Sequence, residues 1–440
     1  MIIAWINCAP ASGLSMKRDN RILMIVNEFP PTGESGVQRP LKFLKYLDRA
    51  GWECWIVTPR KPTKNVLDQS LCEDIPPNAH IIRTHNWGLT ASATDLVADI
   101  RAKTATKKSP AKRLMWKAIK LVNDILFPVD KQIGWTPFAL LASIRVIRKQ
   151  KIRNVYITGF PFSALLMGIP LKRIFGNRIF WVADYRDAWQ FEPLFESNVL
   201  PFRSHIIRKC DDLVLRTCDR ILFVTEYTKA RYQKHFAWIK EKAEVITNGF
   251  DDDDFAQVQP HKFDKFTFVY MGKIYGHKGN PIPLLRAIAN ANIMDFQYIH
   301  IGTIATEVLQ EIESMKLPFF HFWGYKSHTE AINISAGADI NVIVNNNDAE
   351  STRVFPGKIF ELIKIGKPIL AVGPPHGIVK DLMEQTQSGA YACIDDETAI
   401  LDAIHWLRTD YHARTDSATI RAFSRRELTA KLIEVYHNGR

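Results

Sequence analysis

The sequence predicts an α/β fold of two Rossmann-like, doubly wound domains that face each other across a cleft. The chain of 440 residues is too long for one ordinary core, which favours two domains. Short apolar, β-rich runs alternate with segments of helical hydrophobic spacing, as in parallel sheets covered by helices. A polar, turn-rich stretch at 249–265 separates two such series of similar size, so we expect a linker there.

Residues 16–250 are predicted to form the N-terminal domain. The run "RILMIV" (21–26) has the composition of a strand, and after a Gly-rich loop "PLKFLKYLDRAGW" shows helical spacing. "ECWIVTP" then predicts a second strand, so this segment opens a βαβ unit. We expect residues 1–15 to be an artefactual start, because they lack the basic region of a signal peptide and Met16 directly precedes a typical domain opening.

Residues 251–415 are predicted to form a second domain of the same kind. "FTFVYMG", "FQYIHIG", "DINVIVN" and "KPILAVG" have the composition of buried strands, and helical patterns such as "PIPLLRAIANA" lie between them. Ligands of open parallel sheets bind beyond the C-terminal ends of the strands. The loops that follow these strands are therefore the first places to search for a site.

The charge balance favours an anionic partner. The chain has 58 Lys and Arg against 46 Asp and Glu, a formal net charge of +12, which suits a nucleotide, a nucleic acid or a membrane surface. Its six cysteines are scattered without a CxxC pair, so neither a cysteine zinc site nor a disulfide framework is indicated, and a reducing cytoplasm fits best. No apolar stretch approaches the roughly 20 residues that span a bilayer.

Two lysines follow a predicted buried strand in "VYMGKIYGHKG" (269–279). The strand ends at Gly272 and the next helix is expected near Pro281, so Lys273 and Lys278 lie on a loop at the C-terminal edge of the sheet. Two ammonium groups beside a helix N-terminus can bind a diphosphate. A solvated surface turn would have the same sequence, so the motif by itself leaves both interpretations open.

The second candidate segment is "VFPGKIFELIKIGKPILAVGPP" (354–375). Pro356 and Gly357 are typical of a helix start, where free backbone N–H groups can face an anion. Glu361 follows about one turn later, and its carboxylate can accept hydrogen bonds from the two hydroxyls of a ribose. The alternative is a glutamate that only complements the helix dipole.

Several of these segments resemble the retaining glycosyltransferases of family 4, whose architecture is called GT-B. "GKIYGHKG" is similar to the family's G-R/K-L-x-x-x-K-G element, and "PGKIFELIKIGKPILAVGPP" to its P-x-K-x-x-E-x-x-x-x-G-K/R-P-I/V-L-A segment. "FPPTGESGVQRPLKFLKYLDRAGWE", "WVADYRDAW", "CDRILFVTEYTKARY" and "VITNGFDDDDF" fall in the family's usual order. The resemblance covers the chain from about residue 21 to its end.

The resemblance implies a nucleotide-sugar donor bound mainly by the C-terminal domain. Lys273 and Lys278 would stabilise its diphosphate during catalysis, and Glu361 would hold its ribose. The other implied donor-binding residues are Gly33, Gly36, Gly272, Arg353, Pro356, Gly357 and Lys358. The final segment, 416–440, would be a helix that packs back on the N-terminal domain.

Two features concern the sugar and acceptor sides of the implied site. "DYRDAW" follows a predicted strand, so Arg186 and Asp187, together with Arg39, are candidates for the acceptor cleft, with a structural ion pair as the alternative for "DYRDAW". The chain also departs from the family twice. Arg353 stands eight positions before Glu361, where the family often has a glutamate, and the segment at 163–165 lacks the histidine that is often found there.

No metal or other cofactor is predicted. The run "DDDD" (251–254) contains the D-x-D pattern that binds metal in other glycosyltransferases, but its place after "NGF" favours a polar hinge. The thirteen histidines show no HExxH or paired ligand spacing. The nucleotide-sugar would be a substrate, and the acceptor would be a glycan or a lipid-linked glycan, as in surface polysaccharide synthesis.

A basic amphipathic segment suggests where the protein acts. Residues 101–120 include eight basic residues and no acidic one, and a helical wheel over 113–127 gives a narrow basic face opposite a broad apolar arc. This pattern suits an anionic membrane surface, although a surface helix that packs on the core would show it too. The membrane interpretation predicts a cytoplasmic protein held peripherally by Lys112, Arg113, Trp116, Lys117 and Lys120.

The predicted activity is hexosyl transfer with retention, from the nucleotide-sugar to a hydroxyl group. A nucleotide-sugar epimerase would share the architecture, and a non-catalytic family member is left open by Arg353. A nucleic-acid-binding protein is disfavoured, because the basic residues are spread over both halves and no helix-turn-helix, RRM-like or zinc-finger signature is found. The sequence does not specify the base, the sugar, the acceptor or the oligomeric state.

Overall fold

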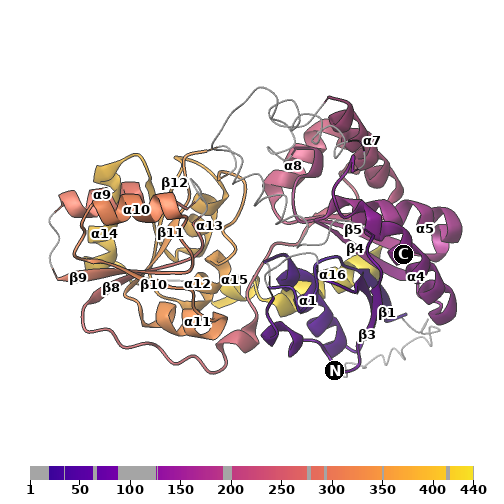
Figure 1. Ribbon diagram of the computed structural model, residues 1–440, viewed down its shortest axis with the longest axis horizontal. Coiled ribbons are helices and arrows are strands. Elements are labelled where there is room, and N and C mark those ends of the chain that lie inside the picture. The colour runs from indigo at the N-terminus through magenta and orange to yellow at the C-terminus, as the bar shows by residue number, and fades with distance from the viewer. Residues whose placement is uncertain are drawn as a thin grey trace, which may run out of the picture.

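Two lobes, each a parallel sheet between layers of helices, make up the protein (Figure 1). This arrangement confirms the predicted pair of Rossmann-like domains. The computed structural model describes residues 19–33, 35–62, 67–87, 125, 127–191, 201–274, 279–291, 295–348, 351–412 and 417–439.

The N-terminal lobe contains a seven-stranded sheet with the order β3-β2-β1-β4-β5-β6-β7. Its strands are β1 (Arg21–Ile25), β2 (Glu53–Pro59), β3 (His80–Thr84), β4 (Asn154–Gly159), β5 (Phe180–Tyr185), β6 (Arg220–Phe223) and β7 (Ala243–Val245). The described helices that pack on it are α1 (Ser35–Arg49), α4 (Thr136–Gln150), α5 (Gly168–Phe175), α7 (Pro201–Thr217), α8 (Glu226–His235) and α16 (Arg425–Asn438). The strand order changes direction between β1 and β4, so the Gly-rich loop after β1 lies at the crevice where such sheets bind ligands.

The C-terminal lobe contains a six-stranded sheet with the order β10-β9-β8-β11-β12-β13. Its strands are β8 (Phe266–Met271), β9 (Phe296–Ile301), β10 (Phe320–Gly324), β11 (Ile340–Val344), β12 (Ile369–Gly373) and β13 (Gly389–Cys393). The described helices of this lobe are α9 (Ile282–Asn290), α10 (Thr306–Ser314), α11 (His328–Gly337), α12 (Ile359–Ile365), α13 (Ile378–Thr386), α14 (Glu397–Thr409) and α15 (Ser417–Arg421). Here the direction changes between β8 and β11, so the two candidate segments follow the two strands that flank the crevice.

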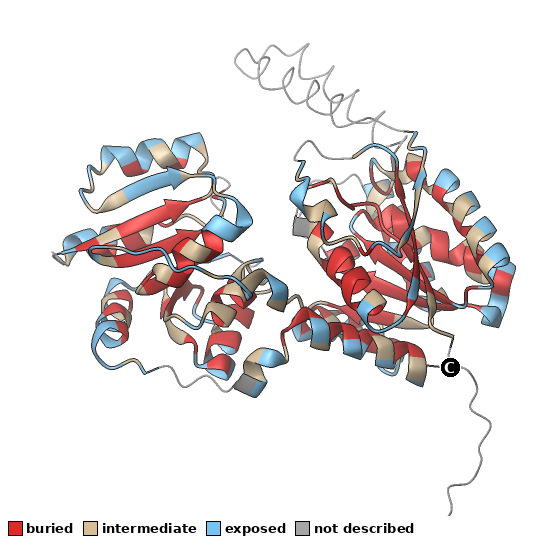
Figure 2. Ribbon diagram, turned by 90° about the horizontal axis from the view of Figure 1, so that it is seen from below, coloured by how far each residue is buried: buried red, intermediate tan, exposed pale blue. Residues whose placement is uncertain are grey.

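The central strands are apolar because helices cover both faces of each sheet. Every residue of β4, β5, β11 and β12 is buried, and the buried residues concentrate in the strands and the inward faces of the helices (Figure 2). Each sheet has a separate hydrophobic cluster on each of its two faces. Strands of this kind appear in a sequence as continuous apolar runs, which is how most of them could be predicted.

The chain crosses between the lobes at two adjacent points. The backbone N–H of Phe250 donates to the carbonyl of Phe423, and the N–H of Arg425 donates to the carbonyl of Phe250. Phe250 and Phe423 belong to a core cluster of the C-terminal lobe. A few residues later, α16 contributes Leu428, Leu432, Val435 and Tyr436 to a core cluster of the N-terminal lobe. Residues far apart in sequence therefore form one junction between the lobes.

Parts of the chain differ from the predicted pattern or lie outside the described residues. The sequence pattern of "FSALLMGIPLKRIFG" is that of one helix, but the structure divides it into a 3-10 turn over Phe162–Met167 and the helix α5. The start at 1–15 and the membrane-binding residues Lys112, Arg113, Trp116, Lys117 and Lys120 lie outside the described residues. Among the described residues, no helix is both long and apolar enough to cross a membrane.

Candidate functional site

Lys358 and Glu361 lie about one helical turn apart at the start of α12, which follows β11. The backbone N–H of Ile359 donates to the carbonyl of Pro356 at 3.1 Å, and α12 begins at Ile359, slightly later than the predicted start. Gly357 is exposed, and a Cβ built there would meet no atom within 4 Å, so packing does not require this glycine. The first turn of α12 therefore places a cation and a carboxylate beside the crevice of the C-terminal sheet.

Glu361 is held by a histidine that the sequence analysis missed. Its Oε1 lies 3.1 Å from Nε2 of His328, the first residue of α11, and the Glu361 side chain is 20% exposed. Burial alone would lower the pKa of His328, but the hydrogen bond and the charge of Glu361 outweigh burial and raise that pKa above 6.5. The other carboxylate oxygen, Oε2, is buried and has no hydrogen-bond partner among the described residues. Glu361 thus has one oxygen held in place and one free to accept a hydrogen bond.

Lys358 is the half-buried cation of this site. Burial lowers the pKa of its ammonium group, and the charge of Glu361 offsets part of that effect. Nearby, His300 at the end of β9 is fully buried with its ring stacked on Tyr270 at 4.9 Å. Burial lowers the pKa of His300 to about 3, so its ring is neutral at pH 7 and leaves the local charge to Lys358. A desolvated ammonium is stabilised by any anion that binds next to it.

The loop after β8 lies against the loop after β11. The backbone N–H of Gly279 donates to Oδ1 of Asn346 at 2.7 Å, which joins the two loops. A Cβ at Gly272 would lie 2.9 Å from the ring of Tyr270, so a larger residue would disturb that ring. Lys273 is exposed on this loop, whereas Lys278 lies outside the described residues. The structure thus brings Lys273 and the Lys358–Glu361 turn to the same edge of one sheet.

On the N-terminal side, Arg186 fixes the Gly-rich loop. Its guanidinium donates to Oε2 of Glu28 at 3.1 Å, to the carbonyl of Gly159 at 2.8 Å, and to the carbonyl of Gly36. A Cβ at Gly36 would lie 1.9 Å from Oε2 of Glu28, so the structure gives this glycine a packing reason that the sequence analysis did not foresee. The ion-pair alternative for "DYRDAW" therefore holds for Arg186, with Glu28 as its partner. Asp187, the next residue, is exposed.

Arg39 is placed inside the N-terminal lobe. Its side chain is 2% exposed, and its guanidinium pairs with the fully buried carboxylate of Asp184 at 2.8 Å. Tyr156 also donates to this carboxylate, at 2.5 Å. Because no part of Arg39 is open to a ligand, we correct the predicted acceptor role and assign Arg39 to the core. Gly33 is half-buried on the loop after β1.

The four aspartates at 251–254 form ion pairs. Three carboxylates, those of Asp74, Asp251 and Asp254, lie close enough together to suggest a cation site. However, Nζ of Lys42 lies 2.6, 2.5 and 3.3 Å from oxygens of these three groups, so an ammonium already occupies the space that a metal ion would need. Within the described residues this cluster therefore does not fit a metal.

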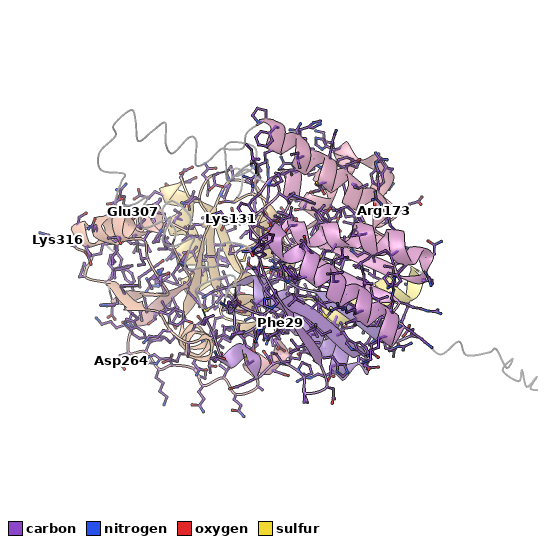
Figure 3. The ribbon with its side chains drawn as sticks, turned by 45° about the vertical axis from the view of Figure 1, so that its right-hand side comes forward. Phe29, Lys131, Arg173, Asp264, Glu307 and Lys316 are labelled. Atoms are coloured by element: carbon purple, nitrogen blue, oxygen red, sulfur yellow. The ribbon has the colours of Figure 1, made fainter. Side chains whose placement is uncertain are left out.

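Arg353 lies where the two lobes meet. Its Cζ is 5.4 Å from the ring centroid of Tyr227, which belongs to α8 of the N-terminal lobe. Both residues line a cavity of about 520 Å³ with side chains from the loops after β11 and β12. The outer ends of the two lobes are marked by Arg173 and Lys316 in Figure 3, where Phe29 shows the position of the loop after β1. Arg353 therefore lies in this cavity, whereas Glu361, eight residues later, lies in the first turn of α12.

Comparisons with known proteins relate the chain to glycosyltransferases. Residues 93–254 match the model of the family described as Glycosyltransferase Family 4. A curated relative, the putative teichuronic acid biosynthesis glycosyltransferase TuaH of Bacillus subtilis (strain 168), is 23% identical over 202 residues. That match covers 44% of this chain and 50% of the relative, so it spans about half the length of the curated protein.

Solved structures of similar fold extend over nearly the whole chain. Sucrose-phosphate synthase from Thermosynechococcus elongatus has a TM-score of 0.63 at 16% identity, covering 95% of this chain and 98% of that one. HepE of Anabaena in complex with UDP and glucose has a TM-score of 0.59 at 14% identity, covering 95% and 99%. At such low identity these likenesses establish the fold, which is GT-B.

Proposed function

We propose that this chain, a GT-B protein related to the group 1 glycosyltransferases, transfers a sugar from a nucleotide diphosphate sugar to a hydroxyl acceptor. The observation that carries the proposal is the first turn of α12. It presents a desolvated ammonium, Lys358, and a carboxylate oxygen without a partner, on Glu361, at the crevice of a parallel sheet. A diphosphate next to a ribose requires these two chemistries side by side.

Each group has a distinct role in holding the donor. Lys358 lies at the diphosphate, whose charge compensates the desolvation that lowers the pKa of the ammonium. Glu361 accepts hydrogen bonds from the ribose hydroxyls while His328 fixes its other oxygen. Lys273 and Lys278, as the family resemblance implies, add positive charge from the loop after β8. The complexes of Anabaena HepE with UDP and with UDP-glucose support a donor of this class.

The reaction breaks the bond between the sugar C1 and the diphosphate oxygen and forms a bond between C1 and the acceptor oxygen. The acceptor proton leaves with the nucleotide diphosphate or passes to solvent. Positive charge develops on the sugar and negative charge on the departing diphosphate, so the lysines stabilise the transition state more than the ground state. Transfer of a hexose with retention is the form of this reaction that the family resemblance favours.

The proposed acceptor is a glycan or a lipid-linked glycan. The name of the Bacillus relative, a putative glycosyltransferase of teichuronic acid biosynthesis, supports an acceptor in surface polysaccharide assembly. Peripheral binding to the cytoplasmic face of a membrane fits such an acceptor, with the basic residues of 101–120 at the lipid. Sedimentation with acidic vesicles is the measurement for this part: binding at low salt and release at high salt are expected, and no binding at low salt would contradict it.

The test of the proposed reaction is the rate of nucleotide release with and without acceptor. Lys358→Ala and Glu361→Ala are each expected to lose about 100-fold in rate, because one preorganised charged group contributes about this much. Lys265→Ala and Glu307→Ala are matched controls, since both side chains are exposed and lie outside the site. Rates near wild type in both site variants would contradict the site. Conversion of the donor into an isomer without acceptor would show an epimerase instead.

A further inference from the structure

The cavity beside Arg353 and Tyr227 lies next to the proposed donor site, at the junction of the lobes. Its volume is about 520 Å³, within the range of small-molecule sites. The loop after β11 forms one wall, the end of the loop after β12 and the start of α13 form another, and Tyr227 of α8 faces them from the N-terminal lobe. The residues that line it are Tyr227, Asn347, Asp348, Thr352, Arg353, His376, Gly377, Ile378 and Asp381.

The walls of the cavity are held by hydrogen bonds within the C-terminal lobe. Asp348 accepts from the backbone N–H of Ser351 at 2.8 Å and from its hydroxyl at 3.0 Å. Asn347 donates to Asp395 at 2.5 Å. At the other wall, the N–H of Ile378 donates to the carbonyl of Thr352 at 3.1 Å. The cavity is therefore formed before a ligand arrives, which lowers the entropic cost of binding.

Gly377 shows how closely the two walls fit. Its φ is +142°, and a Cβ built there would lie 2.9 Å from Cα of Thr352. A larger residue would push the start of α13 away from the loop after β11. The contact keeps Arg353, the residue after Thr352, beside the start of α13.

Arg353 provides the positive charge of the cavity. The Cζ of Arg353 lies 5.4 Å from the ring centroid of Tyr227. The Nε of Arg353 is buried and has no hydrogen-bond partner among the described residues. A guanidinium held on an aromatic ring presents a planar, oriented set of donors, which matches the two oxygens of a carboxylate. This arrangement is specific to arginine, because a lysine offers no planar pair of N–H groups.

The remaining lining groups identify the rest of the ligand. Asp348 and Asp381 add two carboxylates to the cavity, which disfavour a ligand with several negative charges such as a second diphosphate. The same carboxylates can accept hydrogen bonds from hydroxyl groups, and the amide of Asn347 can both donate to and accept from them. One arginine, two carboxylates, an amide and an aromatic ring therefore suit a ligand with many hydroxyls and a single negative charge.

From this combination we infer that the cavity binds a sugar that carries a carboxylate, a hexuronic acid, with its carboxylate on Arg353 and its hydroxyls on Asp348 and Asp381. The inference rests on the proposed function, because the proposed donor site determines which sugar reaches this cavity. Asn346 holds the loop after β8 at Gly279, and the next residue, Asn347, lines the cavity, so the cavity adjoins the proposed diphosphate site. The uronic acid is then the sugar of the donor itself.

The test compares affinities for UDP, UDP-glucose and UDP-glucuronate, and for GDP-mannose against GDP-mannuronate, by calorimetry. Free glucuronate and free glucose are measured alongside by NMR line broadening. The wild type is expected to bind a uronic donor about tenfold more tightly than its neutral counterpart, as one charge-assisted bidentate pair provides. Arg353→Gln, which keeps the length and removes the charge, is expected to reduce that ratio to about one. Arg286→Gln, an exposed arginine of the same lobe paired with Glu311, is the matched control and is expected to keep it.

The outcomes separate this inference from the proposed function. Equal affinities for the uronic and neutral donors in the wild type would overturn the inference and leave the proposed function standing. A preference that survives in Arg353→Gln would also overturn it. Arg353-dependent binding of free glucuronate without binding of any nucleotide would support the cavity and contradict the proposed function. No binding of any of these ligands would overturn the inference and would contradict a uridine or guanosine nucleotide as the donor.

Discussion

At the residue scale, the contact between His328 and Glu361 predicts a pH-dependent stability. Glu361 raises the pKa of His328 in the folded chain, so the pair stabilises the fold below about pH 6.5 and loses this effect as pH rises through the raised pKa. His328 is 43% exposed, so water screens the pair, and we expect about 0.2–1 kcal/mol. The difference in urea midpoint between wild type and His328→Gln should be largest near pH 6 and should shrink towards pH 8.5.

The control for this prediction is His405→Gln. His405 is exposed on α14, away from the site, so this variant should follow the wild type across the same pH range. If the His328→Gln difference does not change between pH 6 and pH 8.5, the two side chains are not coupled as described. The measurement reports on the pair itself and needs no ligand.

Single residues of the site were predictable from the sequence to different extents. Glu361 and Lys358 stand one turn apart in a strongly patterned segment, so the sequence places them on one helix. His328 is 33 residues before Glu361, and only the packing of α11 against α12 brings the two together. Arg39 shows the opposite case: a charged residue after a Gly-rich loop suggests a ligand, but the buried carboxylate that pairs with it is on β5, 145 residues later.

At the scale of elements, the aspartates at 251–254 predict a measurable anchor between the linker and α1. Asp251 is 1% exposed at its side chain and accepts from Lys42 at 2.5 Å and from Lys45 at 2.8 Å. Burial would raise its pKa, but these two lysines and Tyr46 outweigh burial and lower it. Asp251→Ala removes one of the carboxylates that neutralise the buried ammonium of Lys42, so we expect a loss of about 3 kcal/mol in the free energy of unfolding.

The pH dependence of this anchor has the opposite sign to that of His328. Because the pKa of Asp251 is lower in the folded chain, its stabilisation is present above about pH 4 and is lost as pH falls below it. Asp253→Ala is the control, since Asp253 is 42% exposed and should cost less than about 1 kcal/mol. Urea unfolding at pH 7 and pH 3.5 measures both variants, and equal losses for Asp251→Ala and Asp253→Ala would contradict the anchor.

Elements buried on both faces were the predictable ones. The strands β1, β8, β11 and β12 are continuous apolar runs, and each was located from its composition. The strand β3 was not, because it lies at the edge of the sheet, none of its five residues is buried, and three of them (His80, Arg83 and Thr84) are polar or charged. The linker predicted at 249–265 includes the aspartates at 251–254, but the partners of Asp251 on α1 could not be predicted, because Lys42 is 209 residues away in sequence and leaves no local pattern.

At the scale of the whole molecule, the two-lobed architecture followed from length and from the repeated alternation of strands and helices. The junction did not, because it is made by residues from four separate segments. A backbone hydrogen bond between Phe250 and Phe423 connects the two chain segments that pass between the lobes. In addition, Lys364 of α12 pairs with Asp252 at 2.8 Å, and Arg353 contacts Tyr227. Such contacts depend on how the finished lobes meet, which no hydrophobic period encodes.

The central claim is that the first turn of α12 binds a nucleotide diphosphate, and the thermal unfolding midpoint tests it most directly. A ligand that binds only the folded chain at 100 times its Kd stabilises it by about 2.7 kcal/mol, which corresponds to a rise of about 3 °C for a chain of this length. We predict this rise with at least one of UDP, GDP and ADP for the wild type and for Lys265→Ala, and its loss in Lys358→Ala and Glu361→Ala. An unchanged midpoint with all three nucleotides, or an equal rise in Lys358→Ala, would contradict the claim.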